Sequence, residues 1–271
     1  MSDEAAVQAL VAQVQRNAKY AHIAPDLVER LAREELGHRR NAKEAVKHTR
    51  RRLHQAGAVY MGGTPPYGRW LAALRDAGGD RARVEAVCRE AMAAHQSSRE
   101  RLPLLERFYH EVLAELAPVA SVLDLACGLN PLAIPWMPLA PGARYAAYDV
   151  YTDLAAFLQQ ALPLLGVEGT AEAIDLSART PDDVADVALL LKTIPCLEQL
   201  DRTAGARLLR EVRARHLVVS FPIQSLGGRR DRGMPANYRA RFAELVQDRP
   251  WSVTEYAYDS ELVFVVDKGQ R

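Results

Sequence analysis

The chain has 271 residues, of which 49% are hydrophobic, and this composition is typical of a soluble globular protein with one large α/β domain and an appendage. No apolar run approaches the ~20 residues that span a bilayer, and the N-terminus is acidic where a secretory signal is basic and then apolar, which argues against a membrane or secreted protein and predicts a cytoplasmic one. The formal net charge of +1 conceals basic residues crowded towards the N-terminus and acidic residues common from Asp124 to Asp201, a polarity that indicates an anionic partner at one end.

The pattern of hydrophobic residues is helical throughout the first 118 residues. Pro25-Asp26 has the chemistry of a helix start, and Gly37 is expected to end the helix that begins there. The segment GGTPPYG, residues 62–68, is expected to break helix and to join two subdomains. Helices are predicted over residues 7–14, 25–37, 42–56, 83–95 and 99–116.

From Val119 the pattern changes to short, apolar, β-branched runs that alternate with amphipathic helices. Such runs are typical of buried parallel strands in a doubly wound sheet. The last two runs flank a short segment around Tyr258-Asp259-Ser260-Glu261, which is too short for a crossover helix, so they are expected to form an antiparallel hairpin. Strands are predicted over residues 121–126, 144–150, 170–174, 185–191 and 216–221, with the hairpin over 251–256 and 262–267. Parallel strands closed by a hairpin are the methyltransferase version of this sheet.

The stretch SVLDLACGLNP, residues 121–131, joins the first strand to a small-residue turn that lets backbone approach a ligand closely. Asp149 ends the next strand near the ~20-residue offset at which an acid binds ribose hydroxyls. The turn departs from G-x-G-x-x-G, because Gly128 stands alone, so a nucleoside ligand such as S-adenosylmethionine fits better than a dinucleotide. Ligands bind at the carboxyl ends of strands in such sheets, and the residues predicted to converge there are Asp124, Asp149, Asp175, Lys192 and Pro222.

The number and spacing of the cysteines argue against a disulfide framework and against a zinc site. Cys88, Cys127 and Cys196 are odd in number and form no C-x-x-C or Cys/His pair, so we expect free thiols and no metal. Pro195-Cys196 is similar to the nucleophile of cytosine-C5 methyltransferases, but a packed thiol is the preferred interpretation. Pro65-Pro66-Tyr67 precedes the sheet and is expected to be a linker turn, and Trp70 and Trp136 are expected in the core.

Several long motifs in order resemble one family, the Arm family of 16S ribosomal RNA guanine-N7 methyltransferases that give aminoglycoside resistance. The motifs are HQSSRERLPLLERFY from His95, LDLACGLNPLAIPWM from Leu123, LLLKTIPCLEQ from Leu189, SFPIQSLGGRRDRGM from Ser220 and VKHTRRRLH from Val46. The resemblance implies a class I S-adenosylmethionine-dependent methyltransferase fold, Rossmann-like, with an N-terminal helical subdomain. It also implies methyl transfer to N7 of a decoding-site guanine on the assembled 30S subunit.

The resemblance assigns the cofactor-binding residues by motif. Arg101 is expected to hold the methionine carboxylate, Gly128 to pass under the methionine and Asp149 to take the ribose hydroxyls. Asp175 and Leu176 are expected to face the adenine, and Ala126 and Lys192 to line the same pocket. The planar guanidinium of Arg101 suits a carboxylate, although pairing with an acid at helical spacing, such as Glu106, is the simpler interpretation of the residue alone. No catalytic residue is nominated, because N7 carries its own lone pair and the rate is expected to come from positioning.

Two basic segments are candidates for gripping RNA while a base is turned out of its stack. Residues 42–56 carry cations at spacings of four, three and four that share one helix face, and the loop 224–237 joins flexible glycines to three arginines. The predicted rRNA-binding residues are Lys43, Lys47, Arg50, Arg51, Arg52, His54, Arg229, Arg230 and Arg232. An ordinary solvated helix face explains the charge equally well when it is taken alone.

We therefore expect residues 1–75 to form an rRNA-binding helical subdomain and residues 76–271 to form the S-adenosylmethionine-binding domain of a monomer. Two other hypotheses stay open on the residues alone. A small-molecule methyltransferase for natural products would not need the basic helix, and a ribosome-binding assembly factor would keep the pocket without turnover.

Overall fold

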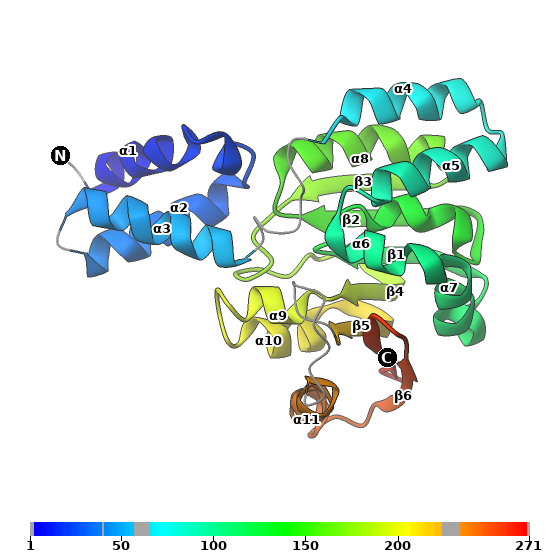
Figure 1. Ribbon diagram of the computed structural model, residues 1–271. Helices are drawn as coiled ribbons and strands as arrows, with labels where there is room; N and C mark the ends of the chain where they lie inside the picture. The colour runs from blue at the N-terminus through cyan, green and yellow to red at the C-terminus, as the bar shows by residue number, and fades with distance from the viewer. Residues whose placement is uncertain (1–2, 40, 57–64, 224–233, 270–271) are drawn as a thin grey trace.

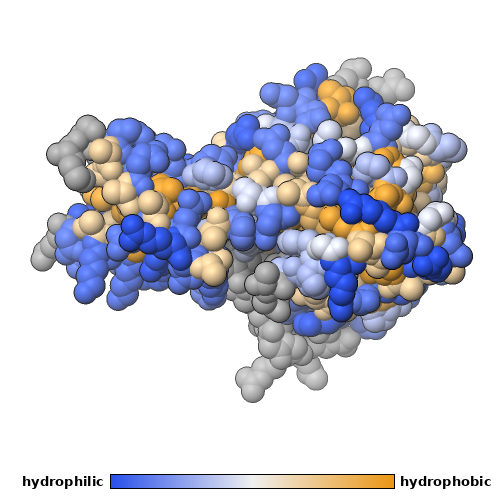
Figure 2. Space-filling model, turned by 90° about the horizontal axis from the view of Figure 1, so that it is seen from above, coloured by the Kyte–Doolittle hydropathy of each residue, from blue (hydrophilic) through white to orange (hydrophobic). Residues whose placement is uncertain are grey.

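The computed structural model describes residues 3–39, 41–56, 65–223 and 234–269. Figure 1 shows a helical lobe, α1 to α3, standing beside a twisted sheet that has helices on both faces. Hydrophilic residues dominate the outer rim of this lobe in Figure 2. Among the described residues, no helix is both long and apolar enough to cross a membrane.

The helical lobe has a hydrophobic core of its own. Val7, Leu10, Val28, Leu31 and Leu53 are almost completely buried in it, as their helical spacing predicts. The second helix continues one residue past its expected stop at Gly37. The elements are α1 (Asp3–Gln15), the 3₁₀ turn η1 (Ala18–Tyr20), α2 (Pro25–His38) and α3 (Ala42–Ala56).

The helices before the sheet differ from the prediction in two ways. A helix, α4, begins at Tyr67 inside the segment expected to break helix, because Trp70, Leu71 and Leu74 give it an apolar face that packs into the core. The single helix predicted over 99–116 is interrupted around Pro103, which lacks the N–H that a continuous helix needs. The elements are α4 (Tyr67–Ala77), α5 (Arg81–Met92), α6 (Gln96–Arg101), η2 (Leu102–Leu104), α7 (Leu105–Leu113) and η3 (Ala114–Leu116).

The described strands form one sheet in the order β3-β2-β1-β4-β5-β7-β6. The first five strands are parallel and β7 pairs antiparallel with both β5 and β6, so the prediction of a parallel sheet closed by a hairpin is confirmed. The strands are β1 (Val119–Leu125), β2 (Leu139–Asp149), β3 (Glu168–Ala173), β4 (Val184–Leu191), β5 (Arg213–Pro222), β6 (Ser252–Ala257) and β7 (Glu261–Asp267).

Hydrophobic cores lie on both faces of the sheet, as expected where helices cover both sides. The chain after β1 is a 3₁₀ segment, η4 (Asn130–Trp136), in place of the expected α-helix; Pro131 and Pro135 lie within it and remove two backbone donors. The remaining helices are α8 (Thr152–Leu164), α9 (Ile194–Leu197), α10 (Ala204–Glu211) and α11 (Met234–Val246).

The predicted boundary between residues 75 and 76 falls inside α4, which packs on the sheet domain. The rings of Tyr67 and Phe157 of α8 stack with centroids 4.8 Å apart, and Trp70 meets the same phenylalanine edge-on. Trp70 and Trp136 are both buried, as expected for core residues. We therefore propose that the division lies between α3 and α4.

Candidate active site

A cleft opens at the carboxyl ends of the parallel strands, where the helical lobe meets the sheet. It holds about 1030 Å³ of empty space, part of it open to solvent. Side chains from both subdomains line it, and among them are all of the residues predicted to bind cofactor, namely Arg101, Ala126, Gly128, Asp149, Asp175, Leu176 and Lys192. Asp124 and Pro222, which were also expected to converge on the crevice, are not among its lining residues.

The turn after β1 brings main chain to the cleft in a conformation that favours glycine. Gly128 has φ +51°, and a Cβ built on it would lie 2.8 Å from the Cε1 atom of His95. Ala126 and Lys192 also have positive φ, at 54° and 60°, although neither is glycine. Such strain in ordinary residues is typical of functional sites, and here all three residues line the same cleft.

Asp149 ends β2 with a buried carboxylate that is held by backbone. Its Oδ2 accepts a hydrogen bond from the N–H of Gly128 at 2.8 Å, and its Oδ1 accepts one from the N–H of Val150 at 2.7 Å. Burial raises the pKa of Asp149, and these backbone donors counteract the shift. The carboxylate therefore connects the glycine turn to the end of β2 and presents charge to the cleft.

Arg101 is completely buried and forms an ion pair with a residue that the motif did not reveal. Its Nε and Nη2 atoms each donate to Glu261 at 2.8 Å, and Nη1 donates to Asn130 at 3.0 Å. Glu261 begins β7, so the interpretation that Arg101 pairs with an acid at helical spacing, such as Glu106, is wrong. Burial alone would raise the pKa of Glu261, but Arg101 and Lys192 hold it below its ordinary value.

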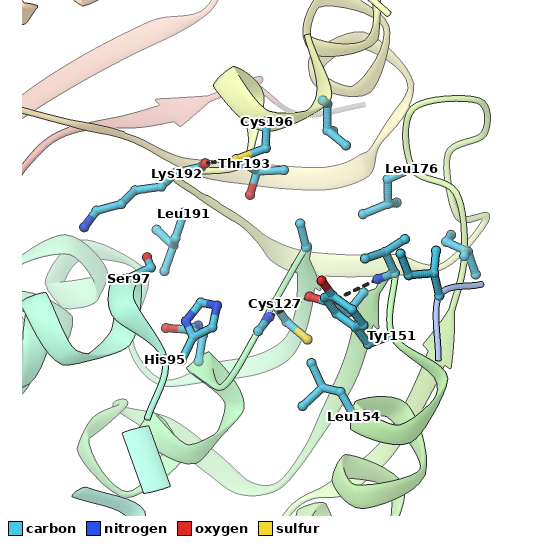
Figure 3. Close-up of a pocket in the computed structure, with 18 of the residues that line it drawn as sticks. His95, Ser97, Cys127, Tyr151, Leu154, Leu176, Leu191, Lys192, Thr193 and Cys196 are labelled. Carbon is cyan, nitrogen blue, oxygen red and sulfur yellow. Dashed lines mark hydrogen bonds between the residues drawn. The ribbon is translucent and has the colours of Figure 1, made fainter. Parts of the chain in front are cut away.

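Lys192 lies at the end of β4 and its ammonium is paired with Glu100 of α6 at 2.6 Å. Figure 3 shows this side chain extending away from Leu176 and Tyr151, towards the opposite end of the pocket. The left-handed backbone of Lys192 is held by donation of its N–H to the carbonyl of Ser220 at 3.0 Å. Glu100 and Lys192 together place a partly buried ion pair at the end of the cleft near Ser97.

Asp124 lies beneath the cleft rather than in it. Burial raises its pKa to about 6, although hydrogen bonds from Asn130 and Tyr145 favour the charged form. Its Oδ1 atom is buried and has no hydrogen-bond partner among the described residues. The network through Asn130 connects this carboxyl to Arg101.

None of the three cysteines forms a disulfide. Burial raises the pKa of both Cys88 and Cys127, which makes these two thiols poor nucleophiles. Cys196 lines the cleft after β4, with its Sγ 3.5 Å from the carbonyl oxygen of Lys192. The described residues contain no cluster of His, Cys, Asp and Glu side chains arranged to hold a metal ion.

The predicted cationic face of α3 is only partly available. Lys43, Lys47, Arg51 and His54 are exposed, and Nδ1 of His54 lies 2.9 Å from Nζ of Lys19. Arg50 and Arg52 are half-buried and each contacts another helix of the lobe, so their assignment to the RNA-binding face stays a prediction. Arg50 donates to the carbonyl of Gln13 at 2.6 Å, and Arg52 pairs with Glu34 at 2.6 Å. Arg229, Arg230 and Arg232 lie outside the described residues.

The geometry at the cleft agrees with a comparison of the sequence with known families. The family model described as ribosomal RNA methyltransferase (FmrO) matches residues 16–265. The chain belongs to the FmrO family of ribosomal RNA methyltransferases.

Relatives of this FmrO-family chain are similar to it in sequence along nearly its whole length. A 16S rRNA (guanine(1405)-N(7))-methyltransferase of Micromonospora echinospora is 39% identical over 262 residues, which cover 94% of each chain. A protein of the same name from Frankia casuarinae is 40% identical over 272 residues, which cover 98% of this chain and 95% of the relative. The solved structure of the 16S rRNA methyltransferase RmtF in complex with S-adenosyl-L-homocysteine is 32% identical and covers 98% of both chains, with a TM-score of 0.80. The predicted methyltransferase fold is thereby confirmed.

Sequence reasoning missed two parts of the cleft, His95 and an apolar wall, and one buried residue outside its lining, Glu261, which pairs with Arg101. Glu261 was assigned only to the hairpin turn, and His95 only to the start of a motif. The helical lobe also contributes an apolar wall, Ile23, Leu27 and Leu53, to which the sequence analysis gave no role in the cleft. The strained turn at Gly128 was the available signal for a close neighbour such as His95, but it does not identify the residue.

A pH prediction follows from His95, whose ring points into the pocket in Figure 3. Burial, then Arg101 and Lys192, lower its pKa from 6.5 to about 4. A base with a depressed folded-state pKa contributes stability above pH 6.5, and that stability is lost as the pH falls towards 4. We therefore expect the thermal midpoint to fall more steeply over this interval in the wild type than in His95→Gln. Equal slopes in melts at pH 7, 6, 5 and 4 would contradict the assignment.

Proposed function

We propose that this FmrO-family chain transfers a methyl group from S-adenosylmethionine to N7 of guanine 1405 of 16S rRNA in the 30S subunit. The observation that carries the proposal is the cleft at the carboxyl ends of β1, β2 and β4, which brings Gly128, Asp149 and Asp175 together. Relatives at about 40% identity bear the name of this reaction over the full length of the chain.

The residues of the cleft fit S-adenosylmethionine, which supplies an electrophilic methyl group on a sulfonium when it is bound. The backbone at Gly128 leaves room where a Cβ would collide with His95, and Asp149 offers acceptors for ribose hydroxyls. We assign Asp175 and Leu176 to the adenine and Arg101 to the methionine carboxylate. Glu261 then fixes the orientation of the Arg101 guanidinium from below.

No proton acceptor is needed from this chain, because guanine N7 attacks with its own lone pair. The chain places the base in line with the methyl group. This placement accelerates the reaction because the entropy of bringing the two groups together is lost on binding and not in the transition state. The methylated guanine carries a positive charge, which repels a cationic drug docking at the same position. We therefore propose aminoglycoside resistance as the biological outcome, in a monomeric protein that acts where ribosomes are, in the cytoplasm.

The deciding experiment incubates purified 30S subunits with the protein and labelled S-adenosylmethionine. Borohydride and aniline then cleave the RNA at N7-methylguanine, and the break is mapped. We expect a single break at guanine 1405. Incorporation of label into small metabolites but not into 30S would favour a small-molecule methyltransferase, and tight 30S binding without incorporation would favour an assembly factor.

The basic face of α3 gives a separate prediction about RNA. Replacing Lys43, Lys47 and Arg51 together with alanine is expected to raise KM for 30S at least about tenfold, because phosphate contacts dominate nucleic-acid affinity. The affinity for S-adenosylhomocysteine is expected to stay unchanged. A charge-matched control replaces the exposed arginines of the sheet domain, Arg83, Arg144 and Arg213. If KM for 30S rises equally in the two triple variants, the assignment of α3 to the RNA-binding surface is wrong.

A further inference from the structure

Arg30 of α2 crosses from the helical lobe to the cofactor cleft. Its Nε donates to Oδ2 of Asp175 at 2.8 Å, and its Nη2 donates to Oγ of Ser177 at 2.6 Å. The third nitrogen, Nη1, donates to Glu34 on the next turn of α2 at 2.9 Å. The guanidinium therefore has a fixed orientation, with one edge against Asp175 and Ser177 and the other anchored on its own helix.

The same contacts immobilise the Asp175 carboxylate. Oδ1 accepts from both the N–H of Ser177, at 2.9 Å, and its hydroxyl, at 2.5 Å, whereas Oδ2 accepts from Arg30. Arg30, Asp175 and Ser177 thus form a closed ring of hydrogen bonds. A carboxylate has about four acceptor sites, so Asp175 can accept a further donor without giving up these partners.

The helical lobe also supplies part of the wall around this carboxylate. Ile23, Leu27 and Leu53 line the cleft, and Ile23 forms an antiparallel bridge with Tyr151, which follows β2. The N–H of Ala24 donates to the carbonyl of Val150 at 2.7 Å. The subdomain assigned to RNA therefore closes one side of the cofactor site.

We propose that Arg30 is a positioning residue of the cofactor site, which holds Asp175 so that its carboxylate accepts a hydrogen bond from the adenine amino group. The proposal rests on the proposed role of Asp175 in binding adenine. The Asp175 carboxylate is held by all of its partners only when α2 packs against the sheet domain and brings Arg30 to it. Selectivity for adenine therefore depends on residues of both subdomains. A preorganised acceptor binds its donor without the entropic cost of fixing a mobile side chain.

The test compares two ligands that differ at the adenine amino group. S-adenosylhomocysteine presents an N–H donor, whereas S-inosylhomocysteine presents a carbonyl oxygen at the same place. Affinities are measured by calorimetry without ribosomes, and the wild type is expected to prefer the adenosyl compound at least about 30-fold, since an unpaired buried polar group costs several-fold to hundreds-fold in binding. We expect Arg30→Ala to reduce this preference to below about fivefold. Arg30→Lys, which keeps the charge but not the planar fork, should restore part of it.

The matched control is Arg33→Ala on the same helix. Arg33 pairs only with Glu4 and Glu29 in the salt bridges of the described residues, and it does not line the cleft. The Arg33→Ala variant is expected to prefer S-adenosylhomocysteine over S-inosylhomocysteine as strongly as the wild type does. Thermal melts establish folding, and Arg30→Gln, which keeps most of the side-chain stem, carries the same expectation if Arg30→Ala does not fold.

The outcomes separate the inference from the proposed function. If the wild type binds neither ligand, the proposed function fails; if it binds both equally, the role of Asp175 fails and the inference fails with it. If the wild type discriminates and Arg30→Ala discriminates equally well, only the inference is overturned. An equal loss of affinity for both ligands also overturns it, because that result assigns Arg30 to subdomain docking alone.

Discussion

Asp149→Ala is expected to abolish methylation of 30S subunits and to weaken binding of S-adenosylhomocysteine about 100-fold or more. Hydrogen bonds to a charged acceptor contribute roughly 1.5–3 kcal/mol each, and a ribose offers two hydroxyls to this carboxylate. The substitution also leaves the N–H of Gly128 without the acceptor that holds the glycine turn at 2.8 Å. Binding is measured by calorimetry, and the RNA product by cleavage at N7-methylguanine.

Asp186 provides the matched control for that prediction. It also lies on a parallel strand and accepts two backbone N–H groups, those of Ala120 and Ser121, at 3.0 and 2.9 Å. It is close to the amino end of β4, whereas the cleft is at the carboxyl end. Asp186→Ala is therefore expected to lower stability but to bind S-adenosylhomocysteine like the wild type. Full activity in Asp149→Ala would contradict the assignment of the ribose site.

The largest effect on stability is expected from Glu261→Ala. The Arg101–Glu261 pair is almost inaccessible to solvent, with exposed side-chain fractions of 1% and 0%. Removing one member of a buried pair leaves the other charge uncompensated and costs about 3–5 kcal/mol of unfolding free energy. Urea denaturation, with the transition midpoint and slope fitted separately, measures this loss.

Two further variants test the reason for that loss. Glu255→Ala breaks the Arg239–Glu255 pair, whose side chains are 47% and 37% exposed, and it is expected to cost only about 0–1 kcal/mol. The double variant Arg101→Met, Glu261→Leu removes both charges and is expected to be more stable than Glu261→Ala, although unable to bind the methionine carboxylate. If Glu261→Ala proves as mild as Glu255→Ala, the buried pair does not stabilise the fold.

Local signals were sufficient for much of the architecture. The apolar runs predicted β1 and β4 to within two residues, because a strand buried on both faces needs nearly continuous apolar side chains. The first residue of β2 lies five residues before its predicted start, and β3 is found although its side chains are exposed or half-buried. Residues 42–56 form α3 as predicted, since the amphipathic period alone specifies a helix of that length. The errors at α4 and at Pro103 have different causes. Tertiary packing stabilises α4 where the local sequence is weak, whereas Pro103 interrupts a helix whose hydrophobic period continues.

The sequence by itself determined the strand-to-helix texture, the glycine turn at Gly128 and the identity of the acids at the strand ends, because each depends on residues close together in the chain. Only the tertiary structure decided which charges meet. Arg101 finds Glu261 across 160 residues, and Arg30 finds Asp175 across 145. Such partners are chosen by how the sheet orders its strands and where the helical lobe docks, and no local periodicity encodes either of these.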